Sequence, residues 1–179
     1  MAIHDDMKLV EHLLDDIDQI TREAHARYRA YPDDVRVEHS ARAAATCTYD
    51  HMVANADRLW ADRRGIVPHE VRGLKVWIIG GSAVVLRFKK MDEDGRTRNY
   101  PTKQAKNFDR QLPLPGLPQP AIRLTAGYWL DETQTEFIRA QIARPLAPGM
   151  TAWCAAIVPP SAPGEAATWQ EVTREKSMF

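Results

Sequence analysis

The chain has 179 residues, of which 44% are hydrophobic and 27% are charged, and its 24 basic and 24 acidic side chains leave a formal net charge of zero. This composition is typical of a folded globular chain and excludes one that is kept disordered by its charge. A neutral chain also lacks the bulk electrostatic attraction of proteins that coat nucleic acid or anionic membrane. Any such partner would have to be bound by a local patch.

The sequence shows no sign of membrane insertion or export. Its strongest apolar run, residues 76–86, is interrupted by glycine and serine and is shorter than the roughly 18 residues of a spanning helix. The first residues do not place an apolar block behind a basic one, as a signal peptide would. Cys47 and Cys154 belong to no CxxC motif, which favours free thiols in a reducing compartment over a disulfide. We therefore predict a cytoplasmic protein with no membrane partner.

Two amphipathic helices are predicted in the first third of the chain. From residue 5 to about residue 30 the apolar positions recur at helical spacing behind two aspartates that are suited to cap the start. Pro32 ends this helix, because proline restricts the residue before it. Residues 40–64 show a second apolar stripe, and Gly65 is placed to stop that helix.

The remainder of the chain predicts an antiparallel sheet. Gly80 and Gly81 separate two β-rich runs, residues 74–79 and 83–90, and glycine supplies the positive φ that a tight hairpin turn needs. The next predicted elements are a short edge strand at 96–100, one or two helical turns within 103–111 and an extended proline-rich connection at 112–120. Three further strands are predicted at 121–130, 136–143 and 150–158.

These elements together define the predicted fold class. We expect an α+β fold in which two N-terminal helices precede a mainly antiparallel meander sheet of about five or six strands. Residues 1–158 form a single domain in this prediction, and residues 159–179 form a Pro-rich linker and a polar C-terminal tail. Trp169 lies in that tail, where an aromatic side chain is a candidate anchor for a partner or for its own domain.

The sequence contains no recognisable catalytic signature, neither a phosphate-binding glycine loop, nor a GxSxG elbow, nor a dinucleotide fingerprint. Whether the protein is an enzyme is left open, and no cofactor is predicted. Cys47 and His51 lie one helical turn apart, but two ligands are too few for a structural zinc site, so no metal is predicted. As a nucleophile and base the pair would need an exposed, electropositive setting that a helical cysteine rarely has.

One basic stretch stands out within residues 87–110. Its members are Arg87, Lys89, Lys90, Arg96, Arg98, Lys103, Lys106 and Arg110. Strand alternation predicts that Arg87 and Lys89 share the solvent face of the hairpin and that Arg96, Arg98 and Tyr100 share a face of the next strand. Arg123 and Arg139 could extend that surface.

Two interpretations of this basic surface are open. As a nucleic-acid site it would use Arg87, Lys89, Arg96, Arg98 and Lys103. In a nuclease, Arg98 and Tyr100 are the candidates to stabilise charge or to move a proton. The alternative is an ordinary solvated sheet face, where lysine and arginine discourage edge-to-edge association.

Three segments carry a resemblance to other proteins. They are Leu-Arg-Phe-Lys-Lys-Met-Asp-Glu-Asp-Gly at 86–95, Arg-Asn-Tyr-Pro-Thr at 98–102 and Leu-Thr-Ala-Gly-Tyr-Trp-Leu-Asp at 124–131. Over about residues 73–157 the chain resembles a group of uncharacterised bacterial and prophage proteins. The resemblance implies a gene on a mobile element near helix-turn-helix regulators and peptidase-like partners, in a toxin–antitoxin-like, phage-defence or regulatory module. It transfers no catalytic residue.

Our leading hypothesis is a protein-binding component of such a module. Its partner would be a regulator, a toxin or antitoxin, or a second copy of this chain. A small metal-independent nuclease toxin of the ribonuclease type, using the basic sheet face, is the first alternative. A non-catalytic nucleic-acid-binding adaptor is the second, and the neutral net charge weighs against it.

Overall fold

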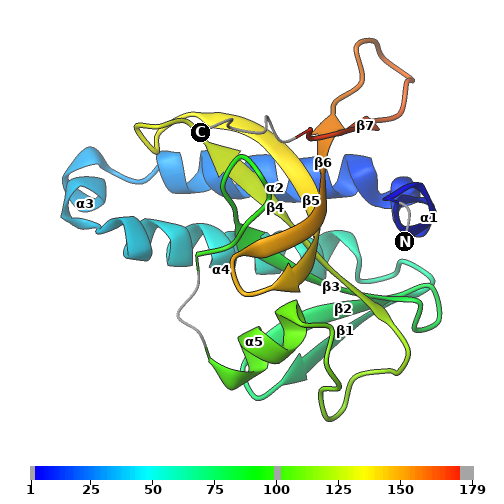
Figure 1. The fold of residues 1–179 in the computed structure, drawn as a ribbon. Helices are drawn as coiled ribbons and strands as arrows, with labels where there is room; N and C mark the ends of the chain where they lie inside the picture. The colour runs from blue at the N-terminus through cyan, green and yellow to red at the C-terminus, as the bar shows by residue number, and fades with distance from the viewer. Residues whose placement is uncertain (1–2, 99–101, 174–179) are drawn as a thin grey trace, which may run out of the picture.

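A computed structural model of the chain describes residues 3–98 and 102–173. Its helices are α1 (Ile3–Lys8), the 3-10 helix η1 (Glu11–Leu13), α2 (Leu14–Arg29), α3 (Asp33–Glu38), α4 (Ala41–Leu59) and α5 (Lys103–Asp109). Its strands are β1 (Ile66–Val71), β2 (Leu74–Ile79), β3 (Val84–Lys90), β4 (Ile122–Leu130), β5 (Phe137–Ala147), β6 (Met150–Val158) and β7 (Thr168–Glu171). Helices at the N-terminus followed by a mainly antiparallel sheet confirm the predicted α+β class, with seven strands in the sheet (Figure 1).

The helical third differs from its prediction in detail. The expected first helix is divided, because the chain turns between α1 and α2 and the Val10 amide donates to the Met7 carbonyl at 2.9 Å. This turn buries both Val10 and Leu13 completely. The expected second helix begins as predicted, where the Ser40 hydroxyl accepts from the Ala43 amide, but ends at Leu59. The short helix α3, which was not predicted, begins directly after Pro32.

The sheet follows chain order, β1 to β7, and all neighbours are antiparallel except β3 and β4. The predicted hairpin of β2 and β3 is confirmed, with Trp77 opposite Leu86 and positive φ at Gly80 and Gly81. Because β3 and β4 are parallel, the chain between them must return to the same end of the sheet. It does so through α5, which lies on the opposite side of the sheet from α2 and α4 (Figure 1).

Three strand predictions need correction. β1 was missed, because Pro68 and two charged or polar neighbours interrupt its apolar pattern, as an edge strand permits. Residues 96–98 are not in a strand, and residues 99 and 100 lie outside the described part of the chain. β7 lies within the segment predicted as a polar tail and pairs with the second half of β6.

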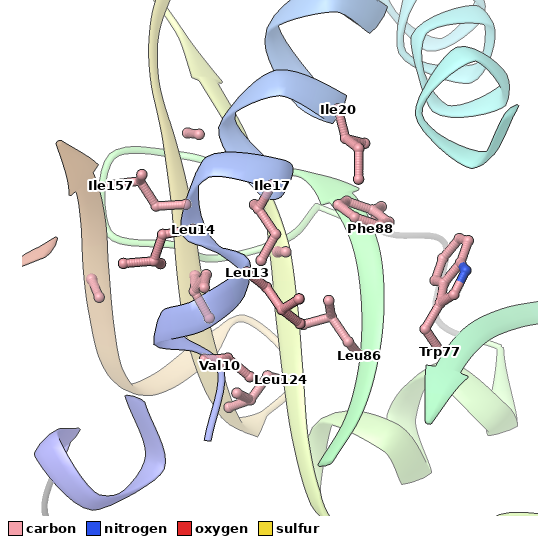
Figure 2. Packing of buried hydrophobic residues seen from close by; sticks show 14 of the residues in the cluster. Val10, Leu13, Leu14, Ile17, Ile20, Trp77, Leu86, Phe88, Leu124 and Ile157 are labelled. Atoms are coloured by element: carbon pink, nitrogen blue, oxygen red, sulfur yellow. The ribbon is translucent and has the colours of Figure 1, made fainter. Parts of the chain in front are cut away.

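One face of the sheet is covered by α2 and α4, which pack against each other. Figure 2 shows Leu13, Ile17 and Ile20 directed toward Leu86 and Phe88 of β3. The apolar stripe predicted for the first helix is therefore buried on the protein's own sheet.

The seam between β3 and β4 depends on Gly127. A Cβ at this position would lie 1.6 Å from the carbonyl oxygen of Lys89, its neighbour across the parallel pair. Only glycine leaves room for the backbone of β3 at that point.

The second face of the sheet carries α5 and the proline-rich connection. Phe108, Leu114 and Leu117 pack there on Val76 and Val85 and form a small separate apolar cluster. The amide side chain of Gln111 fixes this layer to β4 and β5: it donates to the carbonyls of Arg123 (3.0 Å) and Pro145 (3.1 Å), and it accepts from the Arg123 amide. Within the described residues, no helix combines the length and apolar character needed to cross a membrane.

Candidate functional site

A buried polar cluster lies beside this second apolar layer. Arg87 of β3 and Thr125 of β4 are neighbours in the parallel register, so their side chains project from the same face. The Nε of Arg87 donates to the Thr125 hydroxyl at 3.1 Å, and its Nη2 forms an ion pair with Asp109 at the end of α5. The Arg87 guanidinium also lies over the Phe108 ring, 4.2 Å from the ring centre.

The guanidinium of Arg87 is not fully satisfied by these contacts. Arg87 is only 1% exposed, yet its Nη1 has no hydrogen-bond partner among the described residues. On the adjacent strand Arg123 is also buried, and its Nε has no partner there either, although its Nη1 donates to the Asn107 carbonyl at 3.3 Å. Buried donors without partners are rare in folded proteins, and on a cation they invite a bound acceptor.

Burial opposes the charges of this cluster. It lowers the pKa of Arg87, an effect that the charge of Asp109 counteracts. Burial raises the pKa of Asp109, and the charge and hydrogen bond of Arg87 counteract that rise. Burial also lowers the pKa of Lys89, and the positive charge of Arg87 adds to that shift. One buried carboxylate thus faces more than one buried or half-buried cation.

Arg87 and Asp109 line a shallow hollow, whose cavity volume of about 10 Å³ is room for one water molecule. Its lining residues are Arg87, Gly95, Arg96, Thr97, Asp109, Thr125, Ala143, Pro145, Ala147, Gly149, Met150 and Thr151. Polar groups come from β3, β4, α5 and the loop after β3. Ala143, Pro145 and Ala147 of β5 and Met150 of β6 are the apolar part of the lining, which we call the apolar wall. The Met150 side chain is 54% exposed.

The loop after β3 is fixed tightly over β5 and β6. Gln141 of β5 donates to the Asp92 carbonyl at 2.7 Å, and the Thr151 hydroxyl of β6 donates to the Asp94 carbonyl at 3.2 Å. Gly95 allows this close approach: its φ is +78°, and a Cβ there would lie 2.7 Å from the Cβ of Ala143. The polar wall of the hollow is therefore anchored to the sheet.

The part of the predicted basic face that lies on β3 and β4 is buried or half-buried. Arg87, expected on a solvent face, lies under α5, and Arg123 is covered by the same layer. Lys89 is half-buried, and its Nζ lies 5.6 Å from the ring centre of Tyr49 on α4. Alternation correctly placed Arg87 and Arg123 on the same face, but it could not show that a second layer covers that face.

The other predicted site residues lie around the hollow or apart from it. Arg96 lines the hollow and forms an ion pair with Asp94 at 2.6 Å. Arg98 and Lys103 are exposed, and neither lines the hollow. Tyr100 lies outside the described residues. The structure thus brings Arg87 and Arg96 together in one site and leaves the proposed catalytic role of Arg98 and Tyr100 as a prediction.

Trp169, predicted as a partner anchor, contacts its own domain. It is half-buried in β7, packs at a tilt against His4 with ring centres 5.1 Å apart, and donates from Nε1 to Glu11 at 2.9 Å. The side chain is therefore engaged with the N-terminal helical segment in this structure.

The sequence did not indicate Asp109, Thr125 or the apolar wall as parts of a site. Asp109 is the last residue of a helix of only seven residues, and its pairing with Arg87 spans 22 positions. Thr125 is an ordinary residue in a β-rich run. A signal was present in the excess of basic residues over acidic ones in residues 87–110, because a buried member of that stretch needs a counter-charge.

His51, one helical turn after Cys47, has a partner of its own outside α4. His51 is engaged instead by Tyr31, whose hydroxyl lies 2.9 Å from its Nε2. Burial lowers the pKa of His51, so the ring is disposed to be neutral. In the described residues no group of three or more His, Cys, Asp or Glu side chains is arranged to hold a metal ion.

No protein-family model, curated protein or solved structure matches this chain.

Proposed function

We propose that this protein is a binding component that docks a partner polypeptide at the hollow, as part of a mobile-element toxin–antitoxin-like, phage-defence or regulatory module. The type of module rests on the resemblance of residues 73–157 to prophage proteins. The docking site rests on one observation. Met150, which is 54% exposed, lies with Ala147 and Pro145 in the apolar part of a lining that also holds charged and hydroxyl side chains.

The lining of the hollow favours a polypeptide over a nucleic acid. An apolar wall facing charged and hydroxyl groups matches a peptide, which offers apolar side chains and polar groups a few ångströms apart. Proteins that bind single-stranded nucleic acid combine a basic groove with aromatic side chains on which bases stack. None of the described lining residues is aromatic.

Crosslinking from the apolar wall tests this proposal. A photoreactive amino acid would replace Met150 in the native host, and the captured chain would be identified by mass spectrometry. The matched control is the same probe at Val67. This residue is 57% exposed but lies on edge strand β1, which is separated from β6 by four strands. We expect one defined polypeptide at Met150 and none at Val67.

Binding by purified components then decides the site. Met150→Asp should weaken association with the captured polypeptide by about tenfold or more, because it places a charge on the apolar contact, whereas Val67→Asp should not. Equal crosslinking from both positions, or unchanged binding by Met150→Asp, would contradict the proposal.

Nucleic-acid binding is the second candidate, and a specific surface favours it. Lys103 and Lys106 of α5 and Arg110, which follows its last residue, are exposed at spacings of three and four, so they lie on one side of the helix. Titration with short RNA and DNA at low and moderate salt, with a chelator present, tests this surface. Affinity that falls steeply with salt and is lost in the triple glutamine variant would establish it in place of the first proposal.

A further inference from the structure

The two edges of the sheet present different backbone groups to solvent. At the β1 edge, the Gly65 carbonyl faces the β2 side of the strand, where it accepts a hydrogen bond at 2.9 Å. By the alternation of an antiparallel pair, the backbone groups of Ile66, Pro68 and Glu70 face outward. The Ile66 amide donates to the Arg63 carbonyl at 3.3 Å, and Pro68 has no N–H. The β1 edge is therefore largely closed to a further strand.

The β7 edge, by contrast, is open at Trp169 and Glu171. The Val172 amide donates to the Cys154 carbonyl at 2.9 Å, so alternation turns the backbone groups of Trp169 and Glu171 away from β6. Neither the amides nor the carbonyls of these two residues have a hydrogen-bond partner among the described residues. They lie at the rim of the molecule, where β7 is the last strand of the sheet (Figure 1).

Acidic side chains lie around this open edge. Asp15 accepts from the Ala167 amide at 3.0 Å, so the open part of the edge begins after Ala167. Glu11 accepts from Trp169 Nε1 at 2.9 Å. Glu11, Asp15 and Glu171 are all exposed, and none of them forms an ion pair within residues 3–98 and 102–173. An open edge beside carboxylates without counter-charges complements an extended segment that carries basic side chains.

We infer that the outer edge of β7 binds an extended, basic segment of a partner polypeptide as an additional strand. The backbone of that segment pairs with Trp169 and Glu171, and its basic side chains, at alternate positions, lie beside the carboxylates. This edge is separate from the hollow, because Met150 begins β6 whereas β7 pairs with the second half of β6. The inference therefore goes beyond the docking proposed at the hollow.

Peptides selected on the intact protein test the inference. The probe is a display library of random peptides about eight residues long, which is within the normal range of strand lengths. We expect the enriched peptides to carry Lys or Arg at alternate positions and to bind more weakly as the salt concentration rises. In the unmodified protein, hydrogen exchange of the Trp169 and Glu171 amides should slow when such a peptide is added, and that of the Glu70 amide should not.

Variants at the two edges separate backbone pairing from simple charge attraction. Glu171→Pro removes an outward N–H, as Pro68 does in β1, and should weaken peptide binding by about tenfold or more. Glu171→Gln keeps the N–H and loses only the charge, so it should weaken binding several-fold. The matched control is Glu70→Pro, at an exposed position of the β1 edge whose backbone groups also face outward, and it should leave the affinity unchanged. If Glu171→Pro does not fold, Glu171→Gln and hydrogen exchange in the unmodified protein still decide the question.

Clear outcomes overturn the inference. It fails if no peptide slows exchange at Trp169 and Glu171, or if Glu70→Pro weakens binding as much as Glu171→Pro. A dimer that Glu171→Pro dissociates assigns the edge to a second copy of the chain, and peptides that bind only to a chain lacking residues 174–179 assign it to the protein's own end. Either result removes the partner segment. Peptide binding at β7 without a Met150 crosslink leaves this edge standing and removes the docking at the hollow, and the reverse result removes this edge alone.

Discussion

The two faces of the sheet are built on different principles. The face under α2 and α4 is a continuous apolar core, and buried polar side chains of the two helices bond to helix backbone there, as Thr21 does to Ile17 and Asn55 to Ile20. The face under α5 has a small apolar cluster and, beside it, a set of buried charges with two unpartnered guanidinium nitrogens. The contrast indicates that the first face supplies most of the stability, whereas the second holds buried charges whose hydrogen bonds are incomplete among the described residues.

The largest effect should come from the seam that both faces share. Gly127→Ala would place a Cβ 1.6 Å from the Lys89 carbonyl oxygen, so we expect β3 and β4 to separate and the protein to be recovered unfolded or aggregated. Circular dichroism and soluble yield measure this. Gly149→Ala is the control, because its Cβ would meet nothing within 4 Å and only its φ of +72° is strained. Equal behaviour of the two variants would contradict this account of the seam.

On the helix-covered face, Trp77→Ala should lower the free energy of unfolding by about 4 kcal/mol, because the deletion leaves a cavity between Trp60 and Phe88. Urea unfolding measures the loss. Ile78→Ala, a neighbouring half-buried position whose side chain points to the other face, serves as the control and should lose much less. A small loss in Trp77→Ala would mean that this face is not the main source of stability.

On the polar face, Arg87→Met alone should lower the free energy of unfolding by about 3 kcal/mol, since it leaves the Asp109 carboxylate buried without its partner. Adding Asp109→Leu should recover most of that loss, because an apolar pair of similar size needs no partner. The double variant should therefore unfold at a urea concentration close to that of the unmodified protein. A double variant as unstable as the single one would show that this pair supports the fold as the apolar core does.

The smallest effect is on the pH dependence of stability, and it arises on the face that α2 and α4 cover. His25 packs against Tyr128 and Phe137, and burial lowers its pKa below 6.5, with the charge of Arg29 adding to the shift. The unfolded chain therefore takes up this proton first, so the stability that neutral His25 provides is complete above pH 6.5 and declines as the pH falls through the folded pKa. Urea unfolding between about pH 7.5 and about pH 5.5 should show a shallower slope for His25→Gln. His51→Gln is the comparison, because burial lowers the pKa of the His51 ring as well.

Local chemistry was enough to predict most elements of the fold. The start of α4 at Ser40, the hairpin turn at Gly80 and Gly81, and β6 at residues 150–158 were all predicted at the residues where they lie. Local sequence could not predict which segment of the chain covers each face of the sheet. The alternation of β3 fixes which face Arg87 points to, but only the parallel return through α5 places Phe108 and Asp109 over that face.

The candidate site was predictable only in part, for the same reason. Arg87 and Arg96 were both identified from the sequence, yet as members of an exposed patch. Asp109, Thr125 and Met150 come from three separate elements that meet only in the folded chain, and none of them has a composition or spacing signal of its own. A site whose residues meet only across a crossover connection cannot be located from local sequence.

The contacts of the first helical segment have a consequence for synthesis on the ribosome. Asp6 is buried and accepts hydrogen bonds from Arg144 (2.7 Å) and Trp153 (3.1 Å), which follow it by 138 and 147 positions. The Ala167 amide donates to Asp15 across 152 positions. A nascent chain therefore emerges with its apolar helices exposed and cannot complete their packing until β5 and β6 have left the tunnel. Closure of α1 onto β6 should be a late step, and premature termination before residue 144 should release a fragment that chaperones retain.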